Sequence, residues 1–323
     1  MKKFKNSKRY LAFALTFLMP IYPNFELLAG QNKEKIEVSE NINTKEEAKK
    51  KIDKLINLTI KAEENNNLNQ AIFYLEKIIS LEKKFFANAY QEIAETLEWI
   101  GAIYGEEGIY KDAEKYFKEA LYYLEKNSSN EDYQYINNLN SLGVIYHEQF
   151  LLDKAEVQYN KALSILEDKG SNKFGEFIDL FYNLGRLYQD KFSFEKSEYF
   201  YKKSLEIIEK HYGKKNLKYV DSLEGIASIY YEKGNLEKSK KVYKKALYLN
   251  KAIEGNKTNN YLRIATGLGQ VYEKMGLIKE AEELFFKILH SQENNENADI
   301  ATTLNNIGML YQQNGDYEKA YDY

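Results

Sequence analysis

Apolar residues recur along most of this chain at the spacing of one face of an α-helix, and the pattern itself repeats. Around Gly143 they are Leu139, Leu142, Gly143 and Tyr146, which stand at i, i+3, i+4 and i+7. The Gly and Tyr positions return at intervals of 42 residues and once after 39, as Gly101 and Tyr104, Gly185 and Tyr188, Ala227 and Tyr230, Gly269 and Tyr272, and Gly308 and Tyr311. Each repeat is therefore predicted to begin with one amphipathic helix.

A second helix follows in each repeat after a short turn. Counting from the Gly position as zero, the first full repeat has apolar residues at +12, +15, +16, +19 and +20, which are Ala113, Tyr116, Phe117, Ala120 and Leu121. Small residues recur at zero and at +12, so we expect the two helices of a repeat to cross closely there. Substituting a large side chain at such a position would overpack the crossing.

The turn between the two helices carries its own signals near +7. Glycine suits the left-handed residue that ends a helix, and it stands at Gly108, Gly234, Gly276 and Gly315. Residues that can cap the second helix with a side-chain oxygen follow at Asn67, Ser193, Asn235 and Asp316. Phe150 and Phe192 replace the glycine in two repeats, and we expect a different turn in those two.

The repeats begin near residue 44. Thr44 and Glu47 have the spacing of a capping box, which predicts a helix starting there. An earlier, degenerate unit fits the same frame with Thr59 at zero and Ala71 at +12. Residues 31–43 are polar without a helical period and are predicted to be a flexible lead-in, so that residues 44–323 form the repeat array.

The first thirty residues have a different composition. Five basic residues precede the apolar run Leu11–Met19, which Pro20 ends. This is the pattern of a secretory signal, and the run is too short to span a bilayer. We therefore predict a signal peptide at residues 1–30 and an exported protein of the periplasm, the cell envelope or the secreted fraction. The alternative is a membrane-associated stretch that is never cleaved. Gln31 stands where a lipoprotein would carry its acylated Cys, so lipid attachment there is excluded.

Composition and motifs narrow the function. The chain has no Cys, which excludes disulfides. Removing residues 1–30 changes the formal net charge from −3 to about −7, which argues against nucleic-acid binding. The sequence lacks a phosphate-binding loop, a nucleophile elbow and a paired metal motif, so neither an enzyme nor a cofactor is predicted.

The repeated order of a large residue, Leu-Gly, Tyr, Gly, Ala, an aromatic residue and Ala-Leu resembles the tetratricopeptide repeat. The 42-residue period, with Asp299–Gly308 and Lys238–Leu247, is similar to the kinesin-light-chain-like subclass. The resemblance implies an all-α, right-handed superhelical solenoid of antiparallel helix pairs, with six to seven repeats of which the last is incomplete.

That family also implies a concave groove lined by the first helices. Separately, no integral membrane span is predicted after signal removal. Helix geometry places the groove at positions −6, −3, +1, +4 and +5. The predicted groove residues are Glu98, Glu106, Asn137, Asn140, His147, Glu148, Tyr182, Arg186, Asp190, Glu224, Tyr231, Glu232, Gln270 and Asn305, together with Glu95, Asp179, Gln189, Asp221, Arg263, Glu273 and Lys274.

Carboxylates dominate much of this predicted groove. Carboxylates lining one concavity attract a basic or polar extended segment, and Asn amides can pair with its backbone. Four of these carboxylates are expected near helix C-termini, where the helix dipole disfavours anions: Glu106, Glu148, Asp190 and Glu232. The alternative is that these carboxylates are solvated helix faces, which are ordinary in such repeats. A metal role for His147 lacks a second ligand at the required spacing.

The resulting hypothesis is a non-catalytic scaffold that binds a protein or peptide in the groove. Solenoids need a polar cap, and the last repeat stops at Tyr323 without one. We therefore hypothesise that the chain is a fragment or self-associates through its C-terminal end. A sensor arm of a larger protein, with a C-terminal effector such as a caspase-like peptidase outside this chain, is the alternative function. An intracellular peptide-sensing transcription regulator is disfavoured by the export signal and the lack of a DNA-binding segment.

Overall fold

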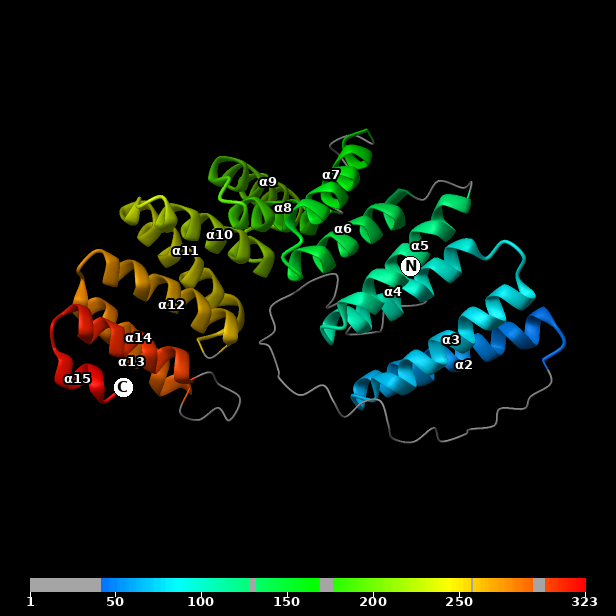
Figure 1. The fold of residues 1–323 in the computed structure, drawn as a ribbon, viewed down its shortest axis with the longest axis horizontal. Coiled ribbons are helices and arrows are strands. Elements are labelled where there is room, and N and C mark those ends of the chain that lie inside the picture. Colours follow the sequence, from blue (N-terminus) through cyan, green and yellow to red (C-terminus); the bar gives the residue numbers. More distant parts are fainter. Residues whose placement is uncertain (1–41, 128–131, 169–176, 257, 293–299) are drawn as a thin grey trace. The chain divides into compact units, whose positions relative to one another are not determined.

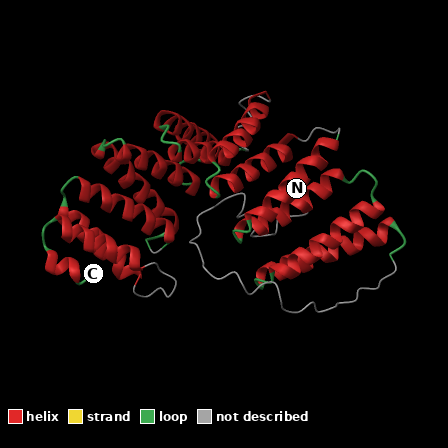
Figure 2. Ribbon diagram, in the orientation of Figure 1, coloured by secondary structure: helices red, strands yellow, loops and turns green. Residues whose placement is uncertain are grey.

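The computed structural model describes residues 42–127, 132–168, 177–256, 258–292 and 300–323, and its regular elements there are all helices (Figure 2). The signal peptide and nearly all of the lead-in fall outside this part of the chain. None of the described helices is long and apolar enough to cross a membrane. The residues divide into two compact units, one up to Asp168 and one from Lys169 on, and each is described by itself.

Consecutive helices pack together as pairs within each unit (Figure 1). The first unit holds the pairs α2 (Lys45–Glu64) with α3 (Leu68–Phe85), α4 (Tyr90–Glu106) with α5 (Tyr110–Lys126), and α6 (Asp132–Glu148) with α7 (Leu152–Asp168). The second holds α8 (Ile178–Asp190) with α9 (Phe194–Tyr212), α10 (Leu217–Glu232) with α11 (Leu236–Glu254), α12 (Asn259–Lys274) with α13 (Ile278–Gln292), and α14 (Ile300–Gln313) with α15 (Tyr317–Tyr321). The predicted all-α fold of helix pairs is thus confirmed.

The helix starts follow the capping chemistry only in part. The capping box is present at α2, where the Glu47 N–H donates to Thr44 Oγ1 and the Thr44 N–H donates to Glu47 Oε2, both at 3.1 Å. Asn67 likewise caps α3 with its side chain. Ser193 and Asn235 make no side-chain cap hydrogen bond, so the prediction for those two is wrong.

The two helices of a pair meet at the repeated glycine, as predicted. A Cβ atom placed on Gly143 would lie 2.4 Å from the ring of Tyr159, and one placed on Gly269 would lie 2.4 Å from the ring of Phe285. The aromatic residue at +16 therefore occupies the space that a side chain at zero would need. Within these two pairs, only glycine at zero lets the helices approach so closely.

The small residue at +12 tightens the same crossing. Ser197 Oγ donates to the carbonyl oxygen of Gly185 at 2.6 Å, and Ser239 Oγ donates to that of Ala227 at 2.7 Å. Both serines are fully buried. The hydroxyl thus satisfies its own hydrogen-bonding need on the backbone of the facing helix, which lets a polar residue take a core position.

In three repeats the Tyr at +3 joins its helix pair to the pair before it. The hydroxyl of Tyr146 donates to Glu114 at 3.0 Å and that of Tyr230 donates to Glu198 at 2.9 Å. Tyr311 makes the corresponding hydrogen bond to Glu282. In each case the Glu belongs to the second helix of the preceding pair, and we call this contact the Tyr–Glu clamp. The tyrosine series therefore combines a packed ring with a directed polar contact between repeats.

The turn residues at +7 all adopt a left-handed backbone. Gly234 has φ 72° and Gly276 has φ 73°, while Phe150 has φ 56° and Phe192 has φ 54°. The Ser193 N–H donates to the Tyr188 carbonyl at 2.8 Å, as the N–H after Gly234 does to Tyr230. The expectation of a different turn at the two phenylalanines is therefore wrong. The hydrogen bonds that end the first helix hold the backbone in this conformation. A phenylalanine at +7 therefore adopts a positive φ despite its steric cost.

The crossing at Gly143 leads to a prediction on stability. Gly143→Ala should lower the free energy of unfolding by about 1–3 kcal/mol, because the added Cβ atom overlaps the Tyr159 ring. Gly308→Ala is the matched control, because its nearest neighbouring atom would be 3.5 Å from the new Cβ. The control should change stability by less than about 1 kcal/mol and toward greater stability. Urea unfolding followed by circular dichroism measures both, and equal effects would contradict the crossing argument.

The left-handed phenylalanines lead to a second prediction. Phe150 and Phe192 are 81% and 78% exposed, so replacing them sacrifices little burial. Left-handed backbone costs a non-glycine residue about 1 kcal/mol, so Phe150→Gly and Phe192→Gly should each raise the free energy of unfolding by roughly 0.5–1 kcal/mol. Gly234→Phe should lower it by a similar amount. Thermal unfolding of the three variants tests this, and destabilisation by both Phe→Gly changes would show that the rings make a stabilising contact.

Candidate functional site

The predicted groove positions lie on the first helices of the pairs. Within the first unit these are α4 and α6, and within the second they are α8, α10, α12 and α14. Consecutive first helices of a unit touch each other directly. Side chains 39 to 42 residues apart can therefore interact across neighbouring first helices, and they do so in the second unit.

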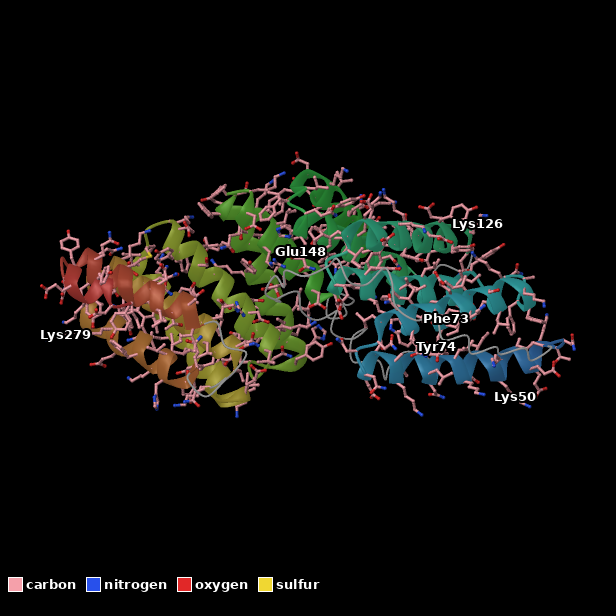
Figure 3. The ribbon with its side chains drawn as sticks, turned by 60° about the horizontal axis from the view of Figure 1, so that its bottom comes forward. Lys50, Phe73, Tyr74, Lys126, Glu148 and Lys279 are labelled. Carbon is pink, nitrogen blue, oxygen red and sulfur yellow. The ribbon has the colours of Figure 1, made fainter. Side chains whose placement is uncertain are left out.

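The first unit places its predicted residues at different depths. Glu98 and His147 are buried, at 6% and 4% exposed, and Glu95 is buried as well. Asn140 is half-buried and Asn137 is exposed. Glu106 and Glu148 are the last residues of α4 and α6, and both are half-buried (Figure 3 labels Glu148). The expected position of these two carboxylates at helix C-termini is therefore observed.

The second unit pairs its predicted carboxylates with cations from the next first helix. Lys218 Nζ of α10 lies 2.5 Å and 2.7 Å from the two carboxylate oxygens of Asp179 on α8. Lys218 was not among the predicted groove residues. Lys218 and Asp179 are 39 residues apart, which is one 42-residue repeat less about one helical turn. Opposite charges at this spacing are the sequence signal from which the ion pair could have been predicted.

Arg263 makes the corresponding contact from α12 to α10. Its guanidinium donates to Glu224 and, at 3.2 Å, to Asp221. The Glu224 and Asp221 side chains are 13% and 15% exposed, so this three-residue cluster is largely desolvated. A forked guanidinium suits this geometry because it can donate to two carboxylates at once.

Burial shifts the pKa values of these groups. Loss of solvent raises the pKa of Glu224 to about 7, against the opposing effect of the Arg263 charge. Burial also raises the pKa values of Asp221 and Asp179, although Arg263 and Lys218 act against it. Burial by itself would lower the pKa of the Arg263 guanidinium. The negative charges of Glu224 and Asp221 have a larger, opposite effect, so the pKa is raised. The ionisation of Glu224 is thus poised near neutral pH.

Second-helix tyrosines reach this face through gaps at glycine. A Cβ atom on Gly225 of α10 would lie 2.4 Å from the Tyr201 ring, which comes from α9. The Tyr201 hydroxyl donates to Gln189 at 3.2 Å, and Gln189 Nε2 donates to Ser228 Oγ at 2.9 Å. Of these four residues, Gln189 was among the predicted groove residues and Ser228 stands at the predicted +1 position, whereas Gly225 and Tyr201 lie outside the predicted positions. The signal was an extra glycine two residues before the Ala227 position.

The two predicted aromatic anchors of the second unit are both in contact with neighbouring side chains. The Tyr182 ring packs against that of Tyr201, with centroids 5.6 Å apart, and burial raises the Tyr182 pKa. Lys274 Nζ lies over the Tyr231 ring, 4.2 Å from its centroid. An incoming ligand would therefore have to displace Lys274 before it could stack on Tyr231.

The remaining predicted residues mark the more accessible parts of this face. Arg186 is half-buried, whereas Asp190 and Glu232 are exposed and end α8 and α10. Gln270 on α12 and Asn305 on α14 are exposed too. The face of the second unit is thus a mixed polar surface, with paired charges inside and exposed polar groups at the helix ends, rather than a uniformly acidic one.

No group of three or more His, Cys, Asp or Glu side chains that could hold a metal ion occurs among the residues with described positions. The polar clusters above are networks of hydrogen bonds and ion pairs. Together their amide, hydroxyl, carboxylate and guanidinium groups offer both hydrogen-bond donors and acceptors.

Solved structures of low sequence identity share this arrangement of helices. Apo RapI is 14% identical with a TM-score of 0.67, and the match covers 86% of this chain and 94% of that one. NprR in complex with its cognate peptide NprX is 20% identical with a TM-score of 0.57, over 88% of this chain and 79% of that one. A protein from Podospora anserina described as a kinesin light chain, with nearly identical TPR-like repeats, is 12% identical with a TM-score of 0.56, over 65% of this chain and 99% of that one.

No curated protein matches the chain. Models of the tetratricopeptide repeat, in contrast, match residues 92–168, 176–247 and 219–294, and a further such model matches residues 300–323. These matches cover more than half of the sequence and coincide with the helix pairs of both units. The chain therefore belongs to the tetratricopeptide repeat family.

Proposed function

We propose that this repeat scaffold binds an extended peptide or protein segment without catalysing a reaction, and that the face formed by α8, α10 and α12 is its binding site. The observation that carries the proposal is the polar network on that face. Neighbouring first helices are joined there by polar contacts rather than apolar ones, namely Arg263 with Glu224 and Gln189 with Ser228. Polar groups at a helix contact cost desolvation, so their presence favours a recognition role.

The ligand is proposed to be extended and polar or basic. A peptide backbone presents alternating donors and acceptors, which Gln189, Ser228 and the hydroxyl of Tyr201 can match. The exposed carboxylates of Asp190 and Glu232 favour cationic side chains on the ligand at the C-terminal ends of α8 and α10. The complex of the similarly folded NprR with its cognate peptide supports a peptide as the occupant.

The carboxylates nearer the centre contribute differently from the initial hypothesis. Because Asp179 is paired with Lys218, and Asp221 and Glu224 are both paired with Arg263, these acids hold the helices in register more than they attract a ligand. The attraction for a basic segment is therefore assigned to the helix ends. The cell envelope remains the proposed location, on the basis of the N-terminal sequence pattern alone.

Peptide binding gives the direct test. Fluorescein-labelled ten-residue peptides of three kinds, Lys-rich, neutral polar and Glu-rich, would be titrated with the protein and followed by anisotropy. The Lys-rich peptide should bind most tightly, and Asp190→Asn with Glu232→Gln should weaken it about threefold to tenfold, since rim charges are worth about 0–1 kcal/mol each. Glu209→Gln with Glu237→Gln makes the same charge change on α9 and α11 and should leave binding unchanged. Preference for the Glu-rich peptide, or equal losses in both double variants, would contradict the proposal.

The raised pKa of Glu224 gives a pH prediction. The ordinary pKa of a glutamate side chain is 4.5. Between that pH and pH 7, Glu224 keeps its proton in the folded state but loses it in the unfolded state. The contribution of Glu224 to the free energy of unfolding therefore falls as the pH rises from 4.5 to 7. Above pH 7 this loss of stability is complete. Relative to Glu224→Gln, which cannot ionise, the parent should lose roughly 1–3 kcal/mol of unfolding free energy between pH 5 and pH 8.

Urea unfolding of both proteins across that pH range measures the difference. Glu209→Gln serves as the control, because Glu209 is an exposed carboxylate on α9. The difference between the parent and this control variant should stay flat with pH. A flat curve for Glu224→Gln as well would show that Glu224 ionises normally and that its environment is more solvated than described.

A further inference from the structure

A cleft of about 370 Å³ opens on the second unit. Its walls are the second helices α11 and α13, and its floor is α12. The floor is lined by Leu268 and by the rings of Tyr261 and Tyr272, and each wall adds one apolar residue, Leu247 from α11 and Leu284 from α13. The cleft shares none of these residues with the face of α8, α10 and α12 proposed above.

The cleft coincides with the loss of a contact that other repeats make. In the α6/α7 pair, Lys161 Nζ donates to the Tyr135 hydroxyl at 2.5 Å. In the α10/α11 pair, Lys245 Nζ donates to the Tyr219 hydroxyl at 3.1 Å. The lysine also lies over the tyrosine ring in both, 4.9 Å and 5.2 Å from the centroid. We call this the Tyr–Lys latch.

The α12/α13 pair has the two residues of the latch at the same 26-residue spacing, as Tyr261 and Lys287. Among the described contacts they form neither the hydrogen bond nor the cation–ring contact, and both side chains line the cleft instead. The sequence thus retains the latch while the structure leaves it open. A ring and an ammonium group are thereby available at the same surface.

Both walls present residues at the spacing of a helix contact face. On α11 these are Lys244, Leu247, Tyr248 and Lys251. Tyr248 is 74% exposed, so its ring is accessible to an incoming partner. Residues at i, i+3, i+4 and i+7 form one stripe along a helix, so the wall is shaped to contact another helix lengthwise.

The charges of the cleft are unevenly divided between its walls. Lys244 and Lys251 make the α11 wall basic, and Lys244 Nζ lies 5.6 Å from the centroid of the Tyr272 ring. The α13 wall has Glu280 and Glu283 with Lys287 one turn beyond. An occupant with apolar side chains toward the floor and carboxylates toward α11 would match both the floor and the basic wall.

We infer that this cleft is a docking site for an amphipathic helix of a partner protein, whose apolar stripe rests on the α12 floor and whose acidic flank faces Lys244 and Lys251. Docking a helix into an apolar groove uses the side chains at i, i+3, i+4 and i+7 as anchors. The site is separate from the proposed peptide-binding face. A scaffold with both would hold two partners, one on its first helices and one on its second helices.

The probe for this inference is a synthetic 18-residue helix with a Leu stripe and a Glu flank, labelled with fluorescein. The comparison peptide has Lys in place of every Glu. Anisotropy titration with the full chain should show the Glu peptide binding and the Lys peptide binding at least roughly tenfold more weakly. Equal affinity for the two peptides would overturn the inference.

The variant Lys244→Glu/Lys251→Glu reverses the charge of the α11 wall. It should weaken the Glu peptide about tenfold and strengthen the Lys peptide, which mere loss of folding would not do. The matched control is Lys241→Glu/Lys279→Glu, which makes the same charge change on α11 and α13 at exposed residues outside the cleft (Figure 3 labels Lys279). Equal weakening by the control variant would show that net charge, not the cleft, determines binding.

Two other occupants are outcomes that would overturn the assignment. Binding of phosphatidylglycerol vesicles that Lys244→Glu/Lys251→Glu abolishes, without binding of the Glu peptide, would identify the cleft as a contact for an anionic lipid surface. Concentration-dependent dimerisation in sedimentation equilibrium, lost in the same variant, would identify a second copy of this chain as the occupant. If the Lys-rich peptide failed to bind the face of α8, α10 and α12, the proposed function would fail, but the binding of the Glu peptide to the cleft would be unaffected. The two proposals can therefore fail separately.

Discussion

The close crossing of the two helices in each pair is the constraint on which the remaining structure depends. At Gly143 and Gly269, the aromatic ring at +16 takes the volume of the missing side chain, as Tyr159 does over Gly143. Where the +12 residue is serine, its hydroxyl bonds to the facing backbone, as Ser197 does to Gly185. Both devices bring the helices together over one short stretch. That contact fixes the orientation of each first helix relative to the second helix of its pair. It thereby also fixes where the polar side chains of the first helix lie.

That constraint is also why most of the fold could be predicted from the sequence. A glycine, a tyrosine and a small residue that return in register every 42 residues leave few alternatives to stacked helix pairs. The turn at Phe150 and Phe192 could not be predicted from local preference, because the helix-ending hydrogen bonds override the residue's own disfavour for positive φ. The caps at Ser193 and Asn235 failed for a related reason, since the frame fixes the turn without their side chains.

The candidate site was predicted less completely, because a repeat frame locates positions along one helix but not partners across two. It placed Asp179, Asp221 and Glu224 on first helices, yet Lys218 and Arg263 turn them into cross-helix pairs. Tyr201 was assigned to the second-helix packing stripe, although it reaches the polar face through Gly225. A sequence can show that many acids occupy one side. Whether they are offered to a ligand depends on which cations the neighbouring repeat supplies.

The Tyr–Glu clamp has a consequence for how order is transmitted along each unit. Every clamp runs backward, from the first helix of one pair to the second helix of the pair before it, as at Tyr230 and Glu198. Contacts of this kind link nearest neighbours alone, so the free energy of a repeat array is a sum of pair terms and junction terms. Loosening one junction therefore uncouples two neighbours without weakening more distant pairs, and amide exchange can proceed pair by pair rather than by unfolding of the entire unit. Such an array can yield locally to a partner while most of its helices keep their native hydrogen bonds.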